Sequence, residues 1–119
     1  MSTPQQPEPD EARDIADVPA VEIITTAAVH LMSAAAVKCG LAPDTEQRTG
    51  TDMMDLDEAR TLIVALAGLV TASAPDLGNQ HARALRDGLK SLQLAFREAS
   101  PFPDPVGEGP GEDLTGPVG

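Results

Sequence analysis

The sequence predicts an all-α protein whose folded part is one unit of three helices. Three stretches between residues 19 and 100 repeat apolar side chains at three- and four-residue spacing. Gly or Pro follows each stretch, and 119 residues leave room for a single domain. We expect a disordered acidic leader over 1–17, a three-helix domain over 18–100, and a disordered acidic tail rich in Pro and Gly over 101–119.

The leader has the composition of a disordered segment. Pro4, Pro7 and Pro9 alternate with Gln, Glu and Asp, so too few apolar side chains are present to offset the entropy lost on ordering. The same acids and prolines stand where a secretory signal would carry a basic start and an apolar run. We therefore expect order to begin near Pro19 and expect no export.

The first helix is expected over residues 19–39. Pro19 suits the first helical position, because the N–H that proline lacks has no partner there, and Glu22 suits the positive end of the helix dipole. Gly40 is expected as a left-handed cap, and Pro43 prevents continuation.

This helix has an unusually wide apolar surface. Glu22, Thr25, Thr26, His30 and Ser33 form one polar stripe, and apolar or small residues occupy most of the remainder. Such a helix needs partners on more than one side. The polar residues interrupt the run before the ~20 residues of a membrane span, so we predict a buried helix that also self-associates. The candidate self-association residues are Ile24, Ala28, Leu31 and Ala35.

A second helix is expected after a long polar loop over residues 41–54. Asp55 and Glu58 resemble a capping box, which starts a helix over about 56–72 that Pro75 ends. Its apolar positions repeat at helical spacing. They are Leu56, Ala59, Leu62, Ile63, Leu66, Leu69 and Val70, with Ser73 on the same stripe.

The third helix is the most clearly amphipathic. Asn79 is a candidate N-cap, and Pro101 ends the helix after Ser100. Because the connection from the second helix is short, the two should form an antiparallel helical hairpin. Its apolar stripe comprises Ala82, Leu85, Leu89, Leu92, Phe96 and Ala99.

Charge and core composition favour protein partners. The net charge is −11, of which residues 1–18 and 101–119 each carry −4, so general binding to nucleic acid is disfavoured. Aromatic residues make up only 2% of the chain. The core is consequently small, and extra burial in a homo-oligomer is physically attractive.

No residue group predicts catalysis, a metal or a cofactor. His30, His81 and the lone Cys39 lack a base and an orienting group at usable spacing. The acids around Asp55 depart from the calcium-loop pattern and are better explained by helix capping. The glycine-rich run GEGPGE lacks the Lys-Ser/Thr pair of a phosphate loop. We expect a protein that is not an enzyme.

One stripe of the third helix carries concentrated positive charge, and we name it the basic stripe. A solvated face with local pairs such as Arg83 to Asp87 explains it without a partner. Alternatively it docks an acidic protein, a nucleic acid, or the chain's own acidic tail. Its residues are Arg83, Arg86, Lys90, Leu94 and Arg97.

Three segments resemble the actinobacterial branch of domain-of-unknown-function family 1844. They are VEIITTAAVHLMSAAAVKCGL, DLDEARTLIVALAGLVTASAPDLG and RALRDGLKSLQLAFREAS, and the resemblance extends to the tail GEGPGEDLTGPV. It implies a helix, a polar loop and a helical pair, in a bacterial cytoplasmic setting with translation genes nearby. It implies no activity, cofactor or site residue.

Two functions of different classes remain open. The first is a small interaction or assembly protein that self-associates through the first helix and binds an unidentified protein partner. The second is an RNA- or ribosome-associated accessory factor that uses the basic stripe, which the acidic charge disfavours. One cysteine fits a reducing compartment, so a cytoplasmic protein without membrane attachment is expected in either case.

Overall fold

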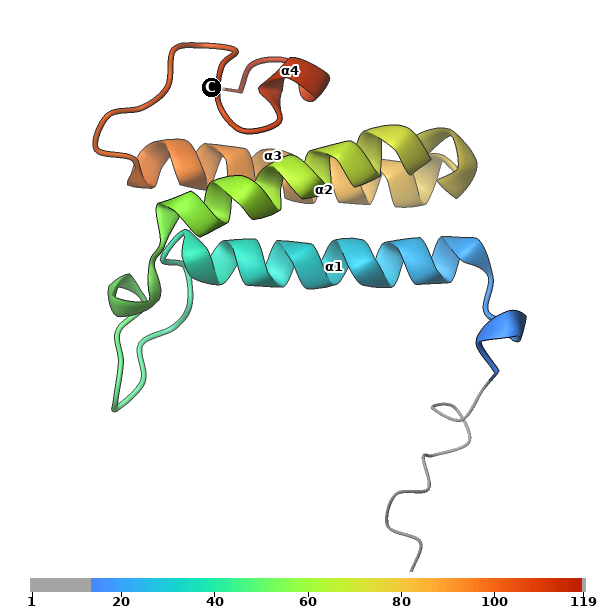
Figure 1. The fold of residues 1–119 in the computed structure, drawn as a ribbon, viewed down its shortest axis with the longest axis horizontal. Helices are drawn as coiled ribbons and strands as arrows, with labels where there is room; N and C mark the ends of the chain where they lie inside the picture. Colours follow the sequence, from blue (N-terminus) through green and yellow to red (C-terminus); the bar gives the residue numbers. More distant parts are fainter. Residues whose placement is uncertain (1–13, 119) are drawn as a thin grey trace, which may run out of the picture.

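The computed structural model describes residues 14–118 and confirms an all-α fold with three long helices (Figure 1). The leader up to residue 13 lies outside the described residues, so its predicted disorder stays a prediction there. Residues 15–17 form a 3-10 helix, which corrects the prediction of disorder for that part of the leader. The elements are η1 (Ile15–Asp17), α1 (Ala20–Lys38), η2 (Thr51–Met53), α2 (Leu56–Leu77), α3 (Asn79–Ala99) and α4 (Glu112–Thr115).

The helices are arranged around the hairpin of α2 and α3. Only Gly78 separates these two helices, which run antiparallel, and α1 packs mainly along α2 (Figure 1). The C-terminal segment lies on the side of the α2–α3 pair away from α1. Gly88 allows α1 to approach α3, since a Cβ at this position would stand 2.8 Å from the sulfur of Met32.

The predicted apolar stripes of α2 and α3 form the core. Ile63 and Leu66 on α2 have no exposed surface, and Leu89 on α3 is 1% exposed. Phe96, one of two aromatic residues, is buried with them. The helical spacing read from the sequence therefore identifies the interior correctly.

The junction between α2 and α3 differs from the prediction. Helix α2 continues through Pro75 to Leu77, because a proline in the last turn removes only one intrahelical hydrogen bond and leaves the preceding turns intact. Gly78, at a φ of 85°, ends α2 and is also the cap residue of α3. Asn79, the predicted N-cap, is instead the first residue of α3.

The other helix ends follow the sequence signals closely. The Asp55 carboxylate accepts a hydrogen bond from the Glu58 backbone N–H at 3.2 Å, as in the predicted cap. Gly40 has a φ of 87°, the left-handed conformation expected after α1. Pro19 is the N-cap of α1 and not its first residue.

The C-terminal tail is ordered up to residue 118, which corrects the prediction of disorder for residues 101–119. Glu112 and Val118 are each 5% exposed, and hydrogen bonds join the tail to α2 and α3. Side chains from other elements supply these contacts. The low apolar content of the tail favours disorder because composition describes only the side chains that the segment itself can bury. It does not include the contacts that other elements provide.

Candidate interaction surfaces

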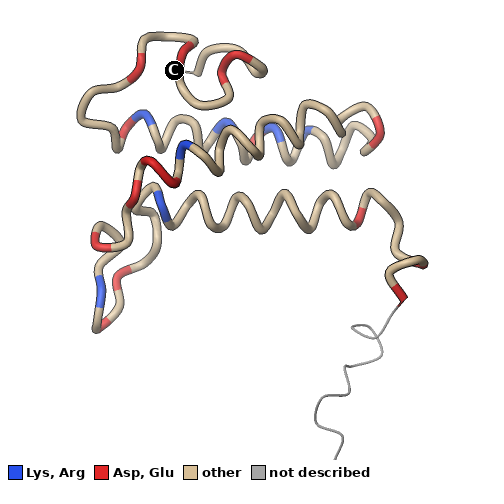
Figure 2. Tube along the Cα trace, viewed as in Figure 1, with Lys and Arg blue, Asp and Glu red and all other residues tan. Residues whose placement is uncertain are grey.

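Helix α1 has an exposed apolar face, which we name the outer face. Ile23, Val29 and Val37 are 44%, 54% and 36% exposed, and the small residue Ala27 is exposed beside them. Exposed Thr26, His30 and Ser33 complete this face. Figure 2 shows α1 without a charged residue between Glu22 and Lys38 at its two ends.

The four predicted self-association residues do not lie on the outer face, and this corrects their assignment. Ala28 and Ala35 have no exposed surface, and Ile24 and Leu31 pack against the same hydrophobic core. All four therefore hold α1 onto the rest of its own chain. The sequence pattern indicates the wide apolar surface of this helix but does not indicate which side of it meets α2.

Within residues 14–118, two helices are long and apolar enough to cross a membrane by length and composition. The most apolar windows of α1 and α2 have mean hydropathies of 1.6 and 1.3. Their buried shares differ, at 11% and 39%. A core helix passes this test as well as a membrane span does, so α2 is explained by its place in the interior, whereas α1 lacks comparable cover.

The residues of the basic stripe differ in exposure. Arg83, Arg86 and Lys90 are exposed, and no ion pair is recorded for them within residues 14–118, including the pair of Arg83 with Asp87. Leu94 is half-buried.

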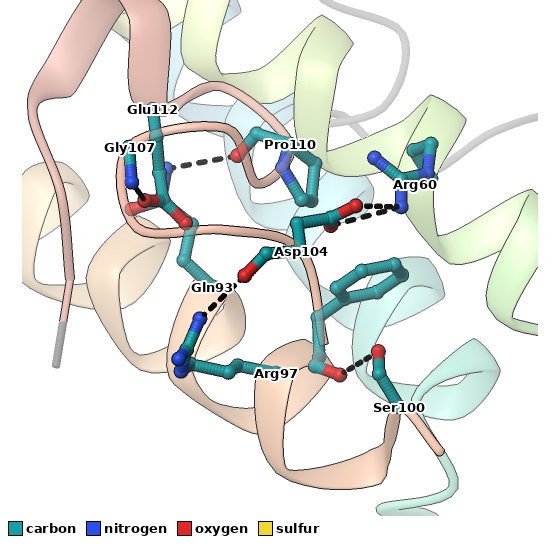
Figure 3. Close-up of polar contacts among 9 residues, drawn as sticks. Arg60, Gln93, Arg97, Ser100, Asp104, Gly107, Pro110 and Glu112 are labelled. Atoms are coloured by element: carbon teal, nitrogen blue, oxygen red, sulfur yellow. Dashed lines mark hydrogen bonds and ion pairs between the residues drawn. The ribbon is translucent and has the colours of Figure 1, made fainter. Parts of the chain in front are cut away.

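Arg97, at the C-terminal end of the stripe, is engaged by the tail. Its guanidinium donates to the backbone carbonyl oxygen of Asp104 at 3.0 Å (Figure 3). Arg60 of α2 holds the Asp104 carboxylate with two hydrogen bonds, at 2.9 and 3.2 Å, and lies 5.0 Å from the centre of the Phe96 ring. The tail is thus a partner of this end of the stripe, one of the three options that the sequence left open.

Gln93 anchors the next part of the tail and is 2% exposed. Its amide nitrogen donates to the Pro110 carbonyl oxygen at 3.0 Å and to the Thr115 hydroxyl at 3.1 Å. Glu112 closes the glycine-rich loop by accepting from the Gly107 backbone N–H at 3.0 Å (Figure 3). Sequence reasoning missed Gln93, since a lone polar residue inside an amphipathic helix carries no signal of a distant partner.

The titratable residues weighed in the sequence are dispersed. His30 and His81 are exposed on different helices, and the described part of the chain holds no group of three His, Cys, Asp or Glu placed to bind a metal ion. Burial raises the pKa of the Cys39 thiol above its usual value. Hydrogen bonds from the Thr49 backbone N–H and side chain lower the pKa of Asp52.

Comparison with known proteins identifies one family. The model of the family described as "Domain of unknown function (DUF1844)" matches residues 20–98. This span runs from the start of α1 almost to the end of α3. No curated protein and no solved structure matches the chain.

Proposed function

Because the chain belongs to the DUF1844 family, whose description names no activity, we propose from its surfaces that it is a non-enzymatic interaction module that self-associates through the outer face of α1. The observation that carries this proposal is the exposure of Ile23, Val29 and Val37 on a helix whose most apolar window is only 11% buried. Removing apolar surface from water is favourable by a free energy of about 25 cal/mol per Å².

A second copy of the chain fits the geometry of this face. Helix α1 has 19 residues and is therefore about 28 Å long. A two-fold symmetric, antiparallel pairing that overlaps α1 along its full length places the centre of each helix at the symmetry axis. Val29 is central within Ala20–Lys38 and would meet its own symmetry mate, while Glu22 would approach Lys38 of the other copy.

A lipid surface suits the outer face less well. Helices that lie on membranes carry Lys and Arg along their polar side, whereas Lys38 at the C-terminal end is the sole cation of α1. The protein's charge of −11 also disfavours approach to anionic lipids. His30 and Ser33 on this face are compatible with a protein interface, where polar groups find partners.

Light scattering on size-exclusion chromatography tests the proposal with the full chain. The mass should exceed that of one chain, 12.3 kDa, at high protein concentration. Val29→Glu places a charge at the proposed axis and should give a monomer. Gln80→Glu adds the same charge at an exposed position of α3, so it controls for net charge and should keep the parental mass.

Two outcomes would overturn self-association through α1. One is a parental protein that stays monomeric at every concentration. The other is an oligomer that Val29→Glu leaves intact while circular dichroism shows that the variant keeps its helices.

The second candidate is an RNA-associated factor, favoured by the three exposed cations of the basic stripe. Arg83, Arg86 and Lys90 lie on one side of α3 without an ion pair among the described residues. Binding should weaken steeply with salt, because each phosphate contact releases a counterion. Fluorescence anisotropy with a structured RNA tests this: loss of binding in Arg83→Glu with Arg86→Glu would support it, and absence of binding at low salt would exclude it.

A further inference from the structure

A pocket of about 330 Å³ lies between α2, α3 and the tail, and the proposed function leaves it unused. Small-molecule sites have volumes of about 300–1,000 Å³, so this pocket suits a small ligand. Its lining residues come from α2, α3 and the tail and include none of α1, and Figure 1 shows the tail on the side of the helical pair away from α1. A ligand here and a partner on the outer face can therefore bind independently.

The pocket has a buried apolar wall. Val70 of α2 and Leu89 of α3 both line it and are each 1% exposed. Val118 of the tail lines it from another element and is 5% exposed. An aliphatic group packed against these side chains would be removed from contact with water, which favours binding.

Two cations also line the pocket. Arg86 and Lys90 are four residues apart on α3, so they lie on the same side of the helix. Neither has an ion pair recorded within residues 14–118. Asp87 also lines the pocket, and this set of three side chains carries a net charge of +1. A ligand with a single negative charge matches this balance better than a polyphosphate does.

Gln93 adds a buried polar group to the pocket. Its amide nitrogen donates to the Pro110 carbonyl oxygen, and because a carbonyl can only accept, this bond fixes the orientation of the amide. The Gln93 Oε1 receives no hydrogen bond from the described residues. It therefore keeps the capacity to accept one from a water molecule beside the ligand.

We propose that this pocket binds a small aliphatic carboxylic acid. The carboxylate pairs with Arg86 and Lys90, and the hydrocarbon part packs against Val70, Leu89 and Val118. Charge-assisted hydrogen bonds to Arg and Lys are the strong contacts available to a carboxylate. Apolar walls with a few placed polar groups are the usual composition of such sites.

Ligand binding in this pocket should stabilise the docked tail. Leu114, Thr115, Pro117 and Val118 line the pocket, so the ligand contacts the docked tail and α3 together. A ligand that binds only the docked state stabilises that state by mass action. Binding is therefore expected to slow the exchange of the tail's amide hydrogens.

Octanoate is a suitable probe, used with the uniformly ¹⁵N-labelled full chain in an NMR titration. Saturable shifts are expected for amides of Leu89, Gln93 and Thr115. Octanol, which lacks the negative charge, and acetate, which lacks the long hydrocarbon chain, should each bind more weakly than octanoate. Arg86→Gln with Lys90→Gln should weaken octanoate binding by about tenfold, equivalent to about 1.4 kcal/mol.

Arg83→Gln is the matched control, because Arg83 is an exposed cation of the same helix that does not line the pocket. It should leave octanoate affinity within about twofold, a change of less than 0.5 kcal/mol. The Val29→Glu variant, which is expected to be monomeric, should bind octanoate as the parent does, which separates failure of this proposal from failure of self-association.

Several results would overturn the carboxylate site. They are absence of saturable shifts up to the solubility limit of octanoate, equal binding of octanol, or shifts confined to α1. Equal losses of affinity in Arg83→Gln and in the Arg86–Lys90 double variant would also overturn it, because the effect would then come from overall charge.

Discussion

Replacing Gly111 by alanine should detach the C-terminal tail while leaving the three long helices folded. Gly111 has a φ of 78°, and a Cβ there would stand 2.6 Å from the Cβ of Ala67 on α2. A left-handed conformation costs a non-glycine residue about 1–2 kcal/mol. Overpacking in a filled site adds about 1–3 kcal/mol, so docking should weaken by about 3 kcal/mol in total.

The tail's own contacts are of similar size. The buried hydrogen bond from Gln93 to Pro110 contributes about 1 kcal/mol, and the partly exposed Arg60–Asp104 pair contributes at most about 1 kcal/mol. The tail should therefore open before the core of α1, α2 and α3 yields. Thermal unfolding followed by circular dichroism should retain a cooperative helical transition.

Hydrogen exchange of the tail amides gives the direct measurement. The N–H groups of Leu114 and Thr115 donate to the Gly111 carbonyl oxygen, and their exchange should accelerate by about a hundredfold for a loss of about 3 kcal/mol. Gly107→Ala is the control, since Gly107 has a φ of 85° but no atom beyond its two chain neighbours lies within 4 Å of the added Cβ.

Adding Ala67→Gly to Gly111→Ala removes the second Cβ of the clash and should restore part of the protection. Exchange in Gly111→Ala no faster than in Gly107→Ala would refute the inference that close packing against Ala67 holds the tail.

Further predictions concern the core, a cap and the thiol. Leu89→Ala should lower the free energy of unfolding by about 2–5 kcal/mol in urea titration, whereas Leu114→Ala, at a half-exposed position, should change it by less than about 0.5 kcal/mol; similar losses would refute this assignment of the core. Asp55→Ala removes the bond to the Glu58 N–H and should lower unfolding free energy by about 1 kcal/mol, while Asp55→Asn should recover most of it. Burial raises the pKa of the Cys39 thiol, so the protonated thiol stabilises the folded state. This contribution to the free energy of unfolding is fully present below the usual thiol pKa of about 8.5 and is lost as pH rises through the pKa of the folded state. Native protein that reacts with a thiol reagent as fast as urea-unfolded protein would contradict this.

The positions of the three long helices and the interior of the helical hairpin follow from local patterns in the sequence. Leu66 and Leu89 lie on apolar stripes of helical period, and such a stripe can be buried on only one side of its helix. Asp55 and Gly40 mark helix ends through local chemistry, because a cap is satisfied by backbone groups a few residues away. The family match over residues 20–98 covers this part of the chain.

The side of α1 that faces inward and the position of the tail depend on packing between separate elements. The apolar surface of α1 is so wide that packing on α2 selected Ala28 and Ala35 for the interior and left Val29 exposed. The tail is held by Gln93 and Arg97, whose partners are 17 and 7 residues away. Such contacts depend on how separate elements meet, and no periodic pattern within either segment encodes them.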